Sequence, residues 1–289
     1  MNHVHHHIIL SIFWPSSSSR GLCREACSDL LVEASSQTLQ VDLSSTLSPK
    51  AMSIEPKFRF TAAETRQMMA DLQLKSIRDL LKALLSPTST LARPPISQFH
   101  VGAVGMTPTG DIYMGVNLEF EDMPLNNSVH AEQFLIANLR HHREPELSVI
   151  AVNAAPCGHC RQFFSELQCS ERVEFMFGDG PNGSFKLHQL LPMRFRPQDL
   201  LGEDPPPLLL SPQNLPLVYS PEAEEVIAQR AAEDDLFSQA AQLALHEARE
   251  SYCPYSNCPA GVALITEHGD VYGGGYMESC AYNPSMQVC

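Results

Sequence analysis

The chain lacks any long apolar run and is poor in aromatic residues. No stretch approaches the roughly 20 apolar residues of a membrane-spanning helix, and the early run at residues 8–14 is short and contains Ser11. Aromatic residues make up only 7% of the 289 positions, yet 44% of the chain is hydrophobic. That fraction suffices for a buried core. We therefore expect a soluble globular protein without a membrane partner.

Positive charge is also scarce. Lys and Arg number 19 against 33 Asp and Glu, so the formal net charge is −14. Nucleic-acid binding draws most of its affinity from Lys and Arg that neutralise phosphates. The charge therefore argues against a nucleic-acid partner and favours a small neutral substrate.

A disulfide framework is not indicated either. The nine cysteines are odd in number and irregularly spaced, and Cys157 and Cys160 form the one tight pair. This usage predicts a reducing environment and a cytoplasmic location. The N-terminus lacks the early basic residue of a secretory signal. Its Ser content leaves an organelle transit peptide open, although its acidic residues count against one.

The composition predicts four segments. Residues 1–57 are rich in His and Ser and are expected to be a disordered extension, and residues 58–199 form a first domain. Residues 200–221 hold six of the chain's 22 prolines, which predicts a linker before a last segment at 222–289. Thr61 and Glu64 have the spacing of a capping box at a helix start. The patterns predict helices at 61–74, 76–85 (ending before Pro87), 129–142, 157–167 and 221–251, and strands at 99–105, 112–116, 148–153 and 172–177.

Alternation of helices and strands indicates a layered α/β domain, and an internal repeat indicates that part of it is duplicated. Residues 99–119 align without a gap on residues 258–278, and one position in three is identical, including the turn Gly110-Asp111 on Gly269-Asp270. The match predicts a duplicated hairpin and hence a duplicated domain. The same alignment sets Cys289 opposite His130, so we expect the second copy to be truncated and non-catalytic.

The residue types that carry chemistry are concentrated in two motifs. His130-Ala131-Glu132 is followed, further along the chain, by a Pro-Cys-Gly-His-Cys segment that contains Cys157 and Cys160. Zinc favours four tetrahedral ligands, and a catalytic site leaves one position for water. Two cysteines three apart in the first turn of a helix can point at one metal, where the helix dipole favours their thiolate forms. We therefore predict one Zn²⁺ per chain, held by His130, Cys157 and Cys160.

Glu132 has the position that a proton shuttle requires. Zinc can lower the pKa of bound water to about 7, and Glu132 lies two residues after a ligand at a helix start. It would accept the proton of that water and deliver protons to a ring nitrogen and a departing amine. The hypothesis is catalytic zinc with Glu132 as general base and then general acid.

The pair Cys157/Cys160 alone would also be compatible with a structural zinc site or a redox pair. A structural site needs a fourth Cys or His nearby, and the side chain of His159 should diverge from the two cysteines on a helix. A redox role would leave the His-Ala-Glu motif without purpose. For Arg161 and Gln162, a helix-surface role is as plausible as a catalytic one.

These motifs, with segments 96–103 and 117–120, resemble the cytidine deaminase family in its dimeric, two-domain form of bacteria and plants, from about residue 58 onward. The resemblance implies a three-layer α/β/α fold with a mixed sheet, followed by a truncated duplicate of the same domain. It implies hydrolysis of cytidine and 2′-deoxycytidine to uridine and 2′-deoxyuridine with release of ammonia, in pyrimidine salvage. It also implies a homodimer, which a truncated second copy would weaken, since an isolated two-stranded hairpin is marginally stable.

The resemblance further implies a substrate-binding set. It comprises Asn117, Leu118 and Glu119, of which Asn117 and Glu119 would hold the ribose 3′-hydroxyl, Phe99 beside the pyrimidine, and the backbone at Ala131 against the base. Simpler interpretations stay open for two of these residues. Phe99 could be a core residue, and the recurrence of Glu119 as Glu278 could reflect a structural role.

Three rival functions remain at this stage. The chain could be a catalytically inactive relative or a structural subunit, because its second domain is incomplete. It could deaminate cytosines in RNA or DNA, which the net charge opposes. It could also be a zinc-stabilised interaction module, which would keep its metal and have no need of Glu132.

Overall fold

The structure is a computed structural model that describes residues 54–177, 184–232 and 234–287, and the backbone of residues 8–13. It divides into two compact units. The larger unit comprises Ser44–Ser211 together with Ser279–Pro284, and the smaller unit comprises Met1–Leu43, Pro212–Glu278 and Ser285–Cys289. The division after Ser211 falls inside the proline-rich segment for which we predicted a linker. No helix of the described residues is long and apolar enough to cross a membrane.

The larger unit is built on a six-stranded mixed sheet with strand order β2-β4-β3-β5-β6-β7. Strands β5 and β6 pair in parallel, and the other neighbours pair antiparallel. The strands that the sequence patterns predicted are all present. The strands are β2 (Arg59–Phe60), β3 (Gly102–Met106), β4 (Ile112–Val116), β5 (Val149–Val152), β6 (Glu174–Phe177) and β7 (Ser184–Phe185).

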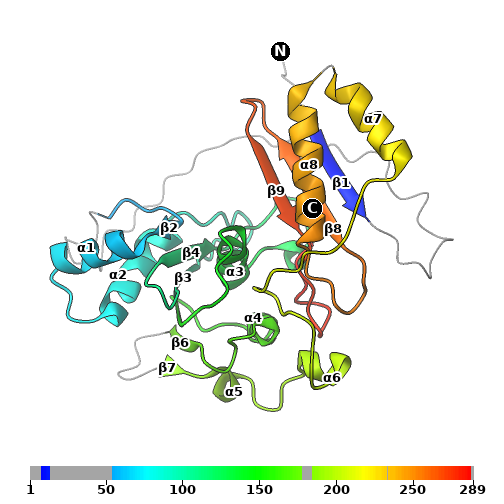
Figure 1. Cartoon of the computed structure of the whole chain (residues 1–289). Helices are drawn as coiled ribbons and strands as arrows, with labels where there is room; N and C mark the ends of the chain where they lie inside the picture. The colour runs from blue at the N-terminus through cyan, green and yellow to red at the C-terminus, as the bar shows by residue number, and fades with distance from the viewer. Residues whose placement is uncertain (1–7, 14–53, 178–183, 233, 288–289) are drawn as a thin grey trace. The chain divides into compact units, whose positions relative to one another are not determined.

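Helices cover both faces of this sheet, which confirms the α/β/α layering (Figure 1). α2 packs on one face, where Leu80 and Leu84 join Val104 in a buried cluster. Successive residues of a strand face opposite sides, so α3 lies on the other face, where a Cβ added at Gly105 would lie 2.9 Å from Leu135. The helices are α1 (Ala62–Asp71), α2 (Ile77–Ser89), α3 (Ala131–His141), α4 (Gly158–Phe163), α5 (Leu187–Leu190) and α6 (Pro197–Leu201), with short 3₁₀ turns η2 (Leu125–Asn127) and η3 (Phe164–Glu166).

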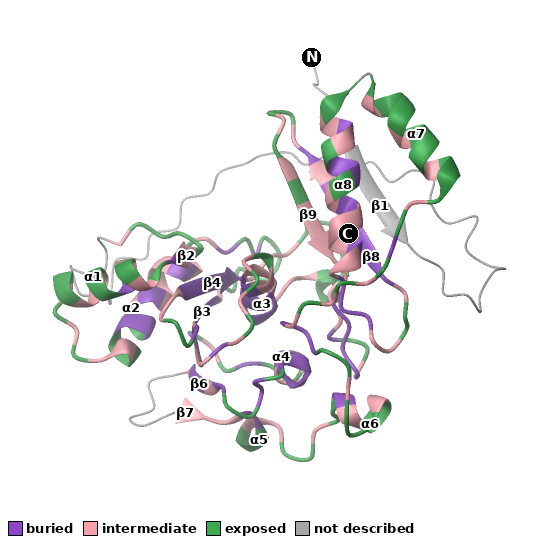
Figure 2. Cartoon of the chain, viewed as in Figure 1, coloured by how far each residue is buried: buried purple, intermediate pink, exposed green. Residues whose placement is uncertain are grey.

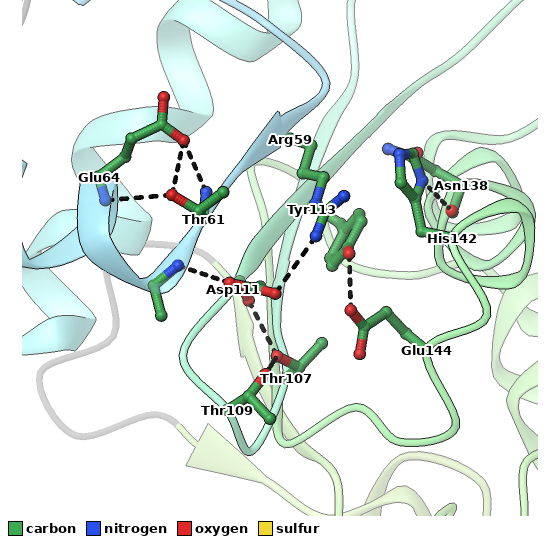
Figure 3. Close-up of polar contacts among 11 residues, drawn as sticks. Arg59, Thr61, Glu64, Thr107, Thr109, Asp111, Tyr113, Asn138, His142 and Glu144 are labelled. Atoms are coloured by element: carbon green, nitrogen blue, oxygen red, sulfur yellow. Dashed lines mark hydrogen bonds and ion pairs between the residues drawn. The ribbon is translucent and has the colours of Figure 1, made fainter.

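Polar contacts attach α1 to the sheet edge (Figure 3). The capping box predicted at Thr61 and Glu64 is present, with the Thr61 N–H donating to the Glu64 carboxylate at 2.8 Å and the Glu64 N–H donating to Thr61 Oγ1 at 3.3 Å. Asp111, in the hairpin turn, accepts the N–H of Ala62 at 2.5 Å. β3 and β4 are mostly buried, whereas much of α1 is exposed (Figure 2).

Helix α2 is longer than predicted, because it continues through Pro87 and ends at Ser89. Proline removes one helix hydrogen bond, and the sequence therefore indicated an earlier end. Hydroxyl groups stabilise the last turn instead: Thr88 Oγ1 donates to the Leu84 carbonyl at 2.7 Å, and Ser89 Oγ donates to that of Ser86 at 2.9 Å. Thr88 is buried, so tertiary packing outweighs the local cost of proline.

The smaller unit contains α7 (Pro221–Ala231), α8 (Asp235–Arg249) and a three-stranded sheet of order β1-β8-β9, formed by β1 (Ile8–Phe13), β8 (Ala260–Ile265) and β9 (Val271–Gly275). The single helix predicted at 221–251 is wrong, because the segment forms two helices. The second begins at Asp234, whose side chain accepts the N–H of Leu236 at 2.9 Å. Asp favours such N-cap positions over helix interiors.

The predicted duplication is confirmed by equivalent contacts at aligned positions of the two copies. The Thr107 N–H donates to Asp111 O at 3.0 Å, and the Thr266 N–H donates to Asp270 O at 2.9 Å. The helix that packs across the first hairpin, α2, also corresponds to the helix that packs across the second, α8. A Cβ at Gly102 would lie 2.9 Å from a carbonyl oxygen of α2, and one at Gly261 would lie 2.4 Å from the matching oxygen of α8.

Strand β1 occupies the position beside β8 that β5 occupies beside β3. Leu10 pairs with Ala263, and Ala151 pairs with Val104, the counterpart of Ala263, in the same antiparallel sense. The disorder predicted for residues 1–57 therefore does not hold at residues 8–13, while residues 1–7 and 14–53 lie outside the described part. Sequence periodicity could not reveal this strand, because its partner β8 lies near the opposite end of the sequence.

Candidate active site

The start of α3 lies directly on the sheet. His130 is the N-cap residue of this helix, and a Cβ added at Gly115 on β4 would lie 2.1 Å from the Ala131 carbonyl oxygen. No side chain fits into that space, so glycine allows the helix start to approach the strand. The contact fixes Ala131 and its neighbours against β4.

A short backbone ladder joins the end of β4 to the residue before His130. The N–H of Leu118 donates to Val129 O, and the N–H of Val129 donates to Leu118 O, each at 2.9 Å. Leu118, predicted as part of the substrate set, thus contributes main-chain bonds that connect the strand end to the start of α3.

The three predicted metal ligands lie together. His130 Nδ1 is 3.5 Å from Cys157 Sγ and 3.3 Å from Cys160 Sγ, and all three ligand atoms lie within 4.8 Å of one another. In a tetrahedral zinc site with usual bond lengths, a nitrogen and a sulfur ligand are about 3.6 Å apart. One imidazole and two sulfurs at these separations therefore fit a zinc ion with a fourth position left over.

The electrostatics of the cysteine pair favour metal binding. A hydrogen bond from Cys160 lowers the pKa of Cys157 to about 3, so its sulfur is a thiolate at neutral pH. Cys157 is the N-cap residue of α4, where the helix dipole also favours a negative charge. The same hydrogen bond, together with burial, raises the pKa of the Cys160 thiol. A metal would release that proton when the second sulfur binds.

Glu132 lies beside the ligands and is not one of them. Its side chain is only 5% exposed, and burial raises the pKa of its carboxyl group. The carboxyl group interacts with the Cys160 thiol, which places it next to the ligand cluster. A buried carboxylate with a raised pKa is suited to accept a proton and to give it back near neutral pH.

His159 supports the cluster from the side. Its ring stacks on that of His130, with centroids 4.9 Å apart and planes inclined by 12°. Burial lowers the pKa of His159, so the ring is neutral and its Nε2 can accept the Gln133 amide N–H at 3.1 Å. Among the described residues, the metal-binding group does not include His159, but its ring lies against the ligand His130.

Glu119 has a structural role that its counterpart repeats. Its carboxylate accepts the N–H groups of Ile96 and Ser97 at 2.9 and 2.8 Å and the Ser97 hydroxyl at 2.5 Å. Burial of Glu119 acts to raise its pKa, but the hydrogen bonds from Ser97 and Ile96 prevail and lower it. Glu278 accepts the corresponding N–H groups of Tyr255 and Ser256 at 3.0 and 3.2 Å. The same loop is therefore held in both copies.

Asn117 and Phe99 are linked through the main chain. Asn117 Oδ1 accepts the N–H of Val101 at 2.8 Å, and its Nδ2 donates to the Phe99 carbonyl at 2.9 Å. The Phe99 side chain is 61% exposed, which excludes the core role that the sequence left open. The second copy has Tyr276 at the position of Asn117, so it keeps the acid and loses the amide.

Arg161 and Gln162, for which the sequence left a helix-surface role open beside a catalytic one, bind main-chain carbonyl groups. Arg161 donates to the Pro156 carbonyl at 2.7 Å and to that of Leu190 at 2.8 Å, which holds the loop before the cysteines. Gln162 donates to Phe195 O at 2.7 Å. Gln133 and Glu166 had no predicted role in the site, because each also binds a backbone atom far away in the sequence, at Pro284 and Cys280.

A site of this composition belongs to the zinc-dependent nucleobase deaminases, and comparison with known proteins narrows the class. Two family models, each described as the cytidine and deoxycytidylate deaminase zinc-binding region, match residues 77–176 and 187–289. Cytidine deaminase 1 of Arabidopsis thaliana is 41% identical over 243 residues, covering 80% of this chain and 79% of its own length. Cytidine deaminase of Shewanella pealeana is 41% identical over 224 residues, covering 76% and 69%. The chain belongs to the cytidine deaminase family of zinc-dependent hydrolases.

Proposed function

We propose that the chain hydrolyses cytidine and 2′-deoxycytidine to uridine and 2′-deoxyuridine with release of ammonia, as part of pyrimidine salvage. The observation that carries this proposal is the cluster of His130, Cys157 and Cys160 with the buried Glu132 beside it. The family membership supports the reaction. The assembled cluster disfavours a catalytically inactive relative, and the burial of Glu132 beside it disfavours a zinc-stabilised interaction module, which would not need this acid.

Glu132 is the residue that moves protons. Zinc bound to the three ligands supplies Lewis-acid activation of water. The Glu132 carboxylate would accept one proton from the attacking water and pass it to the pyrimidine N3. It would then accept the second proton from the hydroxyl group formed at C4 and give it to the amine as the C4–N bond breaks and the C4 carbonyl forms. The burial of Glu132 keeps bulk solvent from competing for these protons. Its raised pKa brings the proton affinity of the carboxylate closer to that of the water, the N3 atom and the amine.

Asn117 and Glu119 would bind the sugar through the lone pairs and the N–H group that their loop contacts do not use. A carboxylate offers about four lone-pair positions, and Glu119 uses three of them in the loop contacts. Asn117 uses one N–H and one lone pair. A ribose 3′-hydroxyl can therefore donate to Glu119 and accept from Asn117, while the exposed Phe99 flanks the base and the Ala131 backbone contacts it.

The homodimer and the cytoplasmic location belong to the same proposal. Exposed apolar side chains of the larger unit support an interface, namely Ile96, Phe120, Met123 and Leu125. The six cysteines of the described residues are not joined in disulfides, which supports a reducing compartment. Light scattering should give twice the chain mass of 32.0 kDa. A monomer that turns over cytidine at full rate would contradict the dimer and leave the reaction standing.

The reaction is tested by replacing Glu132 with Gln, using Glu121→Gln on the exposed surface as the control. We expect kcat for cytidine to fall by about 10²–10⁴-fold, the usual contribution of general acid–base catalysis. Zinc content should stay near one per chain. Normal turnover by the Glu132 variant would show that the mechanism is wrong.

A further inference from the structure

The chain returns to the larger unit after the second copy. Ser279–Pro284 follow Glu278 in the sequence of the smaller unit but belong to the larger one. We call Ser279–Pro284 the return segment. Its first two residues and Pro284 are buried, while Tyr282 is 71% exposed. Its ends are therefore packed into the unit that carries the ligands.

The first end of the return segment is anchored behind α4. The Cys280 N–H donates to Glu166 Oε1 at 2.7 Å, and both residues are 0% exposed. Glu166 is the last residue of η3, which follows directly on α4 and its ligand Cys160. A buried N–H bonded to a carboxylate is one of the stronger hydrogen bonds in proteins. The bond connects the return segment to the helix of the two cysteines.

The other end is anchored at the start of α3. Gln133 Nε2 donates to the Pro284 carbonyl at 2.9 Å, and Gln133 Oε1 accepts the His130 N–H at 3.2 Å. Gln133 is only 2% exposed. Its amide therefore links the return segment to the backbone of a metal ligand and to the helix turn that carries Glu132.

From these contacts we infer that the return segment is a brace for the zinc site and that Gln133 is a positioning residue of the reaction. The two anchors, at Cys280 and Pro284, bind η3, which directly continues α4, and the start of α3. For its effect on turnover, the inference rests on the proposed function. The return segment, which follows the duplicated hairpin in the sequence, thus serves the first copy.

Loss of the Gln133 contacts has a defined consequence. Replacement by Met keeps the length of the side chain but leaves the Pro284 carbonyl and the His130 N–H without their buried partner. The helix start then gains freedom at His130 and Glu132, whereas the loop at residues 96–99 is unchanged. We expect weaker metal retention and a lower kcat, with little change in KM.

The test compares Gln133→Met with Gln67→Met, a control on the exposed side of α1. A second pair ends the chain after Glu278, which removes the return segment, or after Gln287, which keeps it. For Gln133→Met we expect at least about tenfold lower kcat, KM within about twofold, and at least about tenfold faster zinc loss to a chelator. One lost buried hydrogen bond has an effect of about tenfold, and this variant loses the bonds to both Pro284 and His130. The chain ending after Glu278 should lose zinc faster still, and the two controls should match wild type.

The inference is overturned if Gln133→Met retains zinc and kcat like wild type. A chain ending after Glu278 that does the same would also overturn it. If that shortened chain does not fold, Gln133→Met decides alone. Failure of the proposed function is distinguishable, because zinc release and amide hydrogen exchange at residues 130–135 report on the brace even without turnover of cytidine.

Discussion

Replacing Glu119 by Gln should weaken nucleoside turnover, whereas the same replacement at Glu278 should not, although both carboxylates hold equivalent loops. Each accepts two backbone N–H groups, at 2.8–2.9 Å for Glu119 and 3.0–3.2 Å for Glu278. The chain therefore contains its own control for the structural role of this acid. Within the described residues, the amide of Asn117 and the group of possible metal ligands belong to the first copy.

The magnitudes follow from the bonds that change. A hydrogen bond to a charged group contributes about 1.5–3 kcal/mol and a neutral one about 0.5–1.5, so each Gln variant should lose roughly 1–2 kcal/mol of unfolding free energy. The loss of unfolding free energy for Glu119→Gln should lie at the lower end of this range, because solvent screens the more exposed carboxylate of Glu119. A lost bond to the sugar hydroxyl should lower kcat/KM for cytidine by about 10–150-fold in the Glu119 variant alone.

The assay measures kcat/KM by the loss of cytidine absorbance and unfolding by circular dichroism in urea. A cytidine analogue without the 3′-hydroxyl removes the same contact from the side of the substrate. Its kcat/KM should be low with the wild-type chain, and the Glu119→Gln variant should not lower it further. Equal kcat/KM for the two Gln variants would refute a sugar contact. A sugar contact would also be refuted if Glu119→Gln lowered kcat/KM for the analogue further. The loss of the carboxylate and the loss of the 3′-hydroxyl would then act independently.

Three other predictions use the same structure. Gly115→Ala should lower the free energy of unfolding by at least about 2 kcal/mol and remove most of the zinc, because a methyl group would overlap the α3 backbone. Gly274→Ala should leave the stability unchanged, because no atom lies within 4 Å of the added Cβ. Equal urea midpoints for the two variants would contradict this. The hydrogen bond from Lys57 lowers the pKa of Glu64 to about 2, so its stabilisation is complete above about pH 4.5 and is lost as pH falls towards 2. Glu64→Gln should therefore flatten the loss of stability over that range in urea titrations, and an unchanged slope would contradict it. Removal of residues 1–13, but not of 1–7, should leave an edge of β8 unpaired and increase association in light scattering; equal scattering would count against the pairing.

The ligand set was predictable because its information is local. Cys157 and Cys160 are one helical turn apart, and His130 and Glu132 share a helix start, so two short motifs define most of the chemistry. That His130 Nδ1 faces both sulfurs depends on how α3 and α4 pack on the sheet, which the resemblance supplied and periodicity could not.

The supporting contacts could not be predicted in the same way. Gln133 and Glu166 bind backbone atoms of the return segment, which lies far from both in the sequence, and no residue type marks such partners. Pro87 was misleading for the opposite reason, because a strong local signal was outweighed by the buried side chains around it. The duplicated hairpin was visible since its glycines, at Gly102 and Gly261, meet helix backbones in both copies.

The coordination of zinc in the purified full-length chain tests the central claim most directly. X-ray absorption at the zinc edge should show about one zinc per chain with two sulfur ligands near about 2.3 Å and lighter nitrogen or oxygen ligands near about 2.0 Å. Cys157→Ser should remove one of the two sulfurs, while Cys169→Ser, at a buried cysteine outside the cluster, should change neither. Four sulfur ligands, or a chain that binds no zinc, would contradict the site described.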